Sequence, residues 1–93
     1  MIIDFHTHIF PPEIVENRGR YLGKDDWFGQ LYSDPQARLV TAESLVAEME
    51  AAGVDMAVTF GFAWADLGLC RAINDYILDA VAHYPEHLIG FIR

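Results

Sequence analysis

Two histidines separated by one residue, His6 and His8, are the side chains of this sequence best suited to chemistry. They lie in an apolar segment near the amino terminus that predicts a β-strand. Alternate residues of a strand share a face, so both imidazoles are expected on one side, about 6.6 Å apart along the chain. Because an imidazole nitrogen approaches a divalent ion to about 2.1 Å, the two rings can converge on one metal. The spacing predicts part of a metal site.

The same spacing also fits two ordinary strand histidines, one packed and one solvated. The flanking residues favour the metal site. By alternation Asp4 shares the histidine face, where a carboxylate can orient an imidazole from outside the coordination sphere; a solvated residue at the strand start is the alternative. Pro11 and Pro12 end the strand, which leaves His8 near its carboxyl end. Ligands bind at that end of the strands in α/β sheets.

The rest of the chain predicts strands that alternate with helices. Thr41 and Asp66 are suitable helix N-caps, and Gly53 and Pro85 are suitable helix ends. Strands joined by a helical crossover are expected to be parallel neighbours with a right-handed connection. The expected elements are a strand at 1–11, a short helix at 12–17, a helix at 42–52, a strand at 54–60, a helix at 67–83 and a strand at 88–93.

Residues 18–40 lack a regular apolar period and predict a long inserted loop that is rich in aromatic side chains. Such a loop would emerge beside the carboxyl ends of the strands, where Trp27 can wall a pocket. Phe62 and Trp64 follow the second predicted strand at the same end. All three are candidate substrate-binding residues. The alternative is that they pack under the loop, seal the end of the fold or contact another subunit.

The stretch Asp4-Phe5-His6-Thr7-His8, with a proline soon after, resembles the opening strand of the amidohydrolase superfamily, and in particular of its amidohydrolase-related branch. The resemblance continues through 43–91. Residues 53–58 are similar to the family between its first helix and second strand, and 74–76 and 83–91 are similar to its second helix and third strand. Members of this branch are metal-dependent hydrolases, decarboxylases and hydratases with a (β/α)8 barrel.

A (β/α)8 barrel, or TIM barrel, needs roughly 250 residues. The resemblance therefore implies that these 93 residues are one partial domain, 1–93, the amino-terminal part of the barrel: about two and a half β/α units with three parallel strands. An independent α/β fold is the alternative, because domains of about 100 residues are common.

The resemblance also implies an activity. His6 and His8 would bind a divalent ion, with zinc expected from imidazole ligation, and the metal would activate water to attack an amide, ester or lactone carbon of a small molecule. The family takes its remaining ligands and its catalytic histidine from later strands. No position here matches them, so the catalytic residues stay unknown.

Two alternatives to hydrolysis remain. One is decarboxylation of an unsaturated or aromatic carboxylic acid at the same metal. The other is a non-catalytic fragment or interaction module whose exposed third strand pairs with another chain. In each case the remainder of the barrel or another subunit is expected to cover the sheet. The isolated chain is therefore expected to associate as a homo-oligomer.

The composition limits which classes of partner and which cellular compartment are expected. The formal net charge of −8 and the six basic residues argue against nucleic acids and anionic membranes as partners. The sequence has neither a run of 18 apolar residues nor a signal-peptide core, so a cytoplasmic protein is expected.

The single Cys70 cannot form an intramolecular disulfide and is expected to be a small buried residue. His83 and His87 precede the third strand, at the opposite end from the metal, and are expected to be structural.

Overall fold

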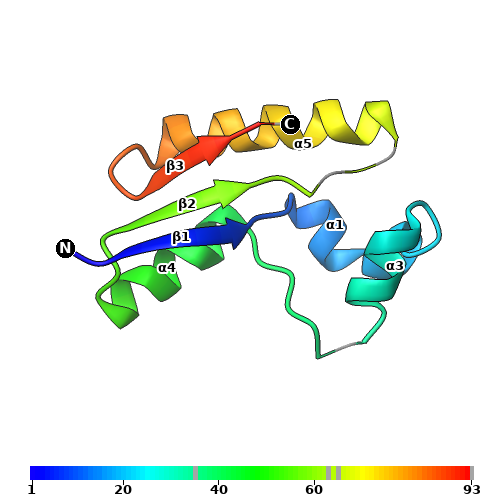
Figure 1. Ribbon diagram of the computed structural model, residues 1–93, viewed down its shortest axis with the longest axis horizontal. Helices are drawn as coiled ribbons and strands as arrows, with labels where there is room; N and C mark the ends of the chain where they lie inside the picture. Colours follow the sequence, from blue (N-terminus) through cyan, green and yellow to red (C-terminus); the bar gives the residue numbers. More distant parts are fainter. Residues whose placement is uncertain (35, 63, 65, 93) are drawn as a thin grey trace.

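The computed structural model describes residues 1–34, 36–62, 64 and 66–92, and within these it does not describe the side chain of Trp27. The chain is an α/β fold with a parallel three-stranded sheet in the order β1-β2-β3 (Figure 1). This confirms the expected parallel arrangement. The elements are β1 (Ile3–His8), α1 (Pro12–Glu16), α2 (Arg18–Tyr21), α3 (Asp26–Tyr32), α4 (Ala42–Ala52), β2 (Met56–Phe60), α5 (Leu67–His83) and β3 (Leu88–Phe91).

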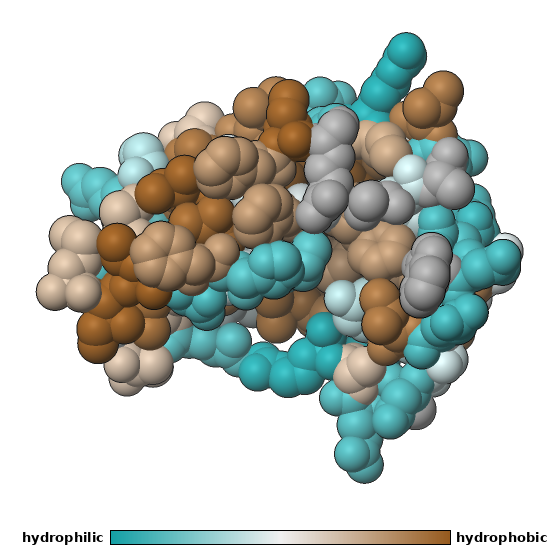
Figure 2. Space-filling view, in the orientation of Figure 1, coloured by the Kyte–Doolittle hydropathy of each residue, from teal (hydrophilic) through white to brown (hydrophobic). Residues whose placement is uncertain are grey.

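Helices α4 and α5 pack on one face of the sheet, and the other face is open (Figure 1). Strand side chains alternate between these faces. Ala57, Thr59 and Leu88 point to the helices and are at most 1% exposed, whereas Ile89 and Phe91 point to the open face and are 42% and 52% exposed. Figure 2 shows the resulting apolar surface over the strands.

The two long helices begin and end where the sequence predicts. The Thr41 hydroxyl accepts a hydrogen bond from the Ser44 N–H at the start of α4, and the Asp66 carboxylate accepts one from the Leu69 N–H at the start of α5. Gly53 ends α4 with a φ of +75°, in the left-handed region that glycine adopts without a steric penalty. These local interactions determine the helix bounds.

Residues 18–40 are not the irregular loop that the sequence pattern predicts, because they contain α2 and α3. The Asp25 carboxylate, which is 8% exposed, accepts a hydrogen bond of 3.1 Å from the Phe28 N–H and caps α3. Helices of four and seven residues are too short to show a clear apolar period. In the sequence Asp25 therefore resembles a loop charge rather than a helix cap.

Candidate metal site

Strand β1 is irregular next to the two histidines. Asp4 pairs with Ala57 and Thr7 with Thr59, so three steps along β1 correspond to two steps along β2. Such a bulge breaks the alternation of side chains. Asp4 consequently lies on the side of Ala57, which faces the helices, and the prediction that it shares the histidine face is wrong.

The imidazoles of His6 and His8 point toward each other. Their Nε2 atoms are 3.0 Å apart, and the ring planes meet at 71° with centroids separated by 4.9 Å. His6 is exposed and His8 is half-buried. In the chain by itself the distance fits a hydrogen bond in which one Nε2–H donates and the other Nε2 accepts.

The same pair fits one metal ion. Two nitrogens 3.0 Å apart and each about 2.05 Å from zinc subtend about 95° at the ion, and a separation of about 3.3 Å would give the tetrahedral angle. A shift of a few tenths of an ångström is within the reach of rotation about the side-chain bonds. Among the described residues no group of three or more His, Cys, Asp or Glu side chains is arranged to hold a metal. The pair therefore supplies two ligands.

Asp4 interacts with the backbone of the bulge rather than with an imidazole. Its Oδ1 accepts a hydrogen bond of 3.1 Å from the His6 N–H. The Thr7 hydroxyl donates one of 3.0 Å to the Val58 carbonyl and links β1 to β2 at the same level. Both side chains thus hold the backbone that carries the imidazoles. A role for Asp4 in orienting a bound metal's ligands stays a prediction.

Phe60 is a site residue that sequence reasoning did not single out. It pairs with His8 across β1 and β2, and with Phe91 across β2 and β3. Its ring centroid lies 5.1 Å from that of His6 and 6.0 Å from that of His8. The alternation of β2 places Phe60 on the open face. The sequence predicts that the stretch starting at Phe60 lies beside the histidines, but which of its rings contacts them depends on the register.

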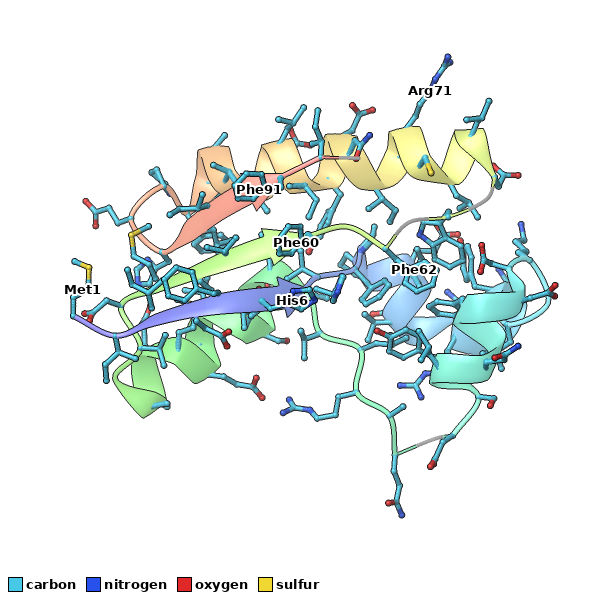
Figure 3. The ribbon with its side chains drawn as sticks, in the orientation of Figure 1. Met1, His6, Phe60, Phe62, Arg71 and Phe91 are labelled. Atoms are coloured by element: carbon cyan, nitrogen blue, oxygen red, sulfur yellow. The ribbon has the colours of Figure 1, made fainter. Side chains whose placement is uncertain are left out.

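Phe62 lies near α1 and α3 (Figure 3), and it belongs with Trp64 to an aromatic cluster. Trp64 is 4% exposed, and its ring centroid lies 4.6 Å from Phe28 and 5.0 Å from Phe62. Tyr32 packs on Phe28 at 4.9 Å, and burial raises the pKa of its phenol above 10.0. The cluster is a packed core between β2 and the short helices.

Within the part of the chain that the structure describes, the side-chain contacts of His6 are with His8 and Phe60, not with Phe62 or Trp64. The structure thus brings the two histidines together and the two aromatic candidates together, as separate groups. The side chain of Trp27 lies outside the described atoms. Substrate contact by these three aromatic residues stays a prediction.

Cys70 and His87, which are expected from the sequence to be structural, lie away from the histidine pair. The Cys70 thiol is half-buried and donates a hydrogen bond of 2.7 Å to the Trp64 carbonyl at the start of α5. The Nε2 of His87 lies 3.7 Å from Oε1 of Glu50, which joins the segment before β3 to α4. Both contacts connect neighbouring elements, although Cys70 is only half-buried and not buried as the sequence predicts.

No protein-family model matches this chain, and its comparison with curated proteins gives no significant match. None of the helices formed by the described residues has the length and apolar character needed to cross a membrane.

Proposed function

We propose that the protein is a metal-dependent hydrolase of the amidohydrolase superfamily, in which His6 and His8 are two of the metal ligands. The observation that carries the proposal is the 3.0 Å separation of their Nε2 atoms at the carboxyl end of a parallel strand. The resemblance of 4–8 and 43–91 to that family supports it. On this proposal 1–93 form the amino-terminal part of a (β/α)8 barrel, and later strands supply the remaining ligands.

The residues of this chain would bind and orient the metal. His6 and His8 each present an Nε2 lone pair, and zinc is the ion that best suits imidazole nitrogens in tetrahedral geometry. When bound, the ion supplies Lewis acidity for the attack of water on an amide, ester or lactone carbonyl. Asp4 holds the His6 backbone amide and thereby supports the bulge. The pair lies at the carboxyl end of β1, which is the end where parallel α/β folds bind small molecules.

Decarboxylation of an unsaturated or aromatic acid is the second candidate. Phe91 stacks on Phe60 with centroids 5.5 Å apart and is 52% exposed. A flat aromatic surface beside the metal ligands suits a planar substrate. Assays of the complete protein would separate the two reactions, because hydrolysis releases an acid with an alcohol or amine, whereas decarboxylation releases carbon dioxide.

Zinc titration of the purified chain against a chromophoric chelator tests the proposal. We expect zinc binding by the wild type, and a loss of at least about tenfold in affinity for His6→Ala and for His8→Ala, since disturbing even the groups that support metal ligands costs 10- to 100-fold. His83→Ala is the matched control, because this exposed histidine lies in the last turn of α5.

Two results would contradict the proposal. One is a wild-type chain that binds no zinc, and the other is binding that survives both substitutions unchanged. Absence of zinc together with concentration-dependent association would instead favour an interaction module that uses the apolar sheet face. Sedimentation of the same samples at several concentrations measures that association.

A further inference from the structure

The ring of Phe60 contacts both imidazoles of the candidate metal site. It is tilted by 34° to the ring of His6 and by 44° to the ring of His8, with centroid separations of 5.1 and 6.0 Å. Offset and tilted arrangements at these separations are favourable for aromatic pairs. One side chain of β2 thus packs against both proposed ligands of β1.

Phe60 is itself supported from the opposite side. Phe91 of β3 stacks on it at an interplanar angle of 19°, with centroids 5.5 Å apart. The register places His8, Phe60 and Phe91 side by side across the three strands. Figure 3 shows the rings of His6, Phe60 and Phe91 in succession across the sheet. The Phe60 ring is therefore held between the imidazoles and Phe91.

The contacts of the His6 ring within the described part of the chain are with other rings. A ligating histidine commonly donates its second ring N–H to a carboxylate or a carbonyl, which sets the ring orientation. In the described part of the chain the His6 ring instead contacts His8 and Phe60, while the nearby Asp4 carboxylate bonds to the His6 backbone N–H. Phe60 is therefore the side chain of β2 that can orient the His6 ring.

We infer that Phe60 is a positioning residue that holds the two imidazoles in the converging orientation needed to bind one metal ion. The inference rests on the proposed function, since it assigns a role at the same site. Phe60 acts through the histidines and donates no ligand of its own. Its flat face restricts rotation of both imidazoles, and an aliphatic side chain of similar hydrophobicity would not.

Zinc affinity and the visible spectrum of the cobalt(II) complex test the role in metal binding. Phe60→Leu keeps an apolar side chain and should weaken zinc binding about three- to tenfold, the range expected for losing aromatic pairs. The cobalt spectrum should change in intensity as the ligand geometry relaxes. Phe60→Tyr keeps the ring and should retain wild-type affinity. Circular dichroism checks that each variant is folded.

Phe91→Leu is the matched control, because Phe91 stacks on Phe60 from the side away from the histidines. Its effect should be smaller than that of Phe60→Leu. An equal loss in both variants would assign the effect to general packing of the open face and would overturn the inference. Wild-type affinity in Phe60→Leu would overturn it as well.

Nuclear magnetic resonance of the metal-free chain separates this inference from the proposed function. Ring protons of His6 and His8 should show a mutual nuclear Overhauser effect and ring-current shifts, and both should diminish in Phe60→Leu but persist in Phe60→Tyr. If the wild type binds no zinc, the proposed function fails and these signals alone decide the positioning role. Unchanged ring-to-ring signals in Phe60→Leu would refute it.

Discussion

Replacement of Gly90 by alanine should destabilise the contact between β3 and α5. A Cβ atom at this position would lie 2.7 Å from Cγ2 of Val81 and 2.8 Å from Cγ2 of Ile77, closer than carbon atoms pack in proteins. Both methyl groups belong to β-branched side chains in a helix, which have one strongly preferred rotamer. The strand and the helix must therefore move apart.

The magnitude follows from two opposing contributions. Overpacking of a well-packed core costs about 1–3 kcal/mol. Replacing glycine by alanine also reduces the backbone freedom of the unfolded chain, which stabilises the folded state by about 0.4–1 kcal/mol. We expect the free energy of unfolding of Gly90→Ala to fall by about 1–2 kcal/mol. Gly23→Ala is the matched control: no atom lies within 4 Å of its Cβ position and its φ is not positive, so it should be neutral or stabilising.

Urea unfolding followed by circular dichroism measures both variants. If the free energy of unfolding falls by about 1 kcal/mol per molar urea, the urea midpoint of Gly90→Ala should be about 1–2 M lower than that of the wild type. The dependence of the free energy on urea concentration should be unchanged. Val81→Ala in the same chain removes one of the two clashing methyl groups and should make the Gly90 substitution less costly. A Gly90→Ala variant that unfolds at the wild-type urea concentration would refute the close approach of α5 to β3.

Two further predictions concern α5. Asp66→Ala should lower the free energy of unfolding by about 1 kcal/mol, because it removes the acceptor of the Leu69 N–H. Asp66→Asn should restore most of the loss, and urea unfolding midpoints measure both variants. Equal midpoints for Asp66→Ala and Asp66→Asn would contradict the role of Asp66 as a helix cap. Burial raises the pKa of Tyr76 above 10.0, so the unfolded chain loses the phenol proton first as the pH rises. The stabilisation from Tyr76 is complete below pH 10 and is lost as the pH rises through the raised pKa. In the wild type the urea midpoint should therefore fall between about pH 9 and about pH 11, and this fall should be smaller in Tyr76→Phe. An equal fall in both proteins would show that other groups cause the pH dependence.

The elements whose signals are local were predicted correctly. Thr41, Gly53 and Asp66 mark helix ends through hydrogen bonds and backbone conformations that span only a few residues, so their effect can be read from the sequence. The helical apolar stripe of α5, with Ile73 and Ile77 buried, is likewise a property of the segment itself. The alternation of strands and crossover helices then implied a parallel sheet.

Residue type, spacing and capping are local properties, so they suffice to predict two imidazoles at the end of an opening strand in a parallel α/β fold. The side chains that surround the imidazoles depend on long-range pairing and packing. The bulge in β1 moves Asp4 to the side of Ala57, and the register of three strands places Phe60 against His6. Pairing between strands distant in sequence depends on the packing of the whole sheet against its helices, and a one-residue shift changes the face of every side chain beyond it.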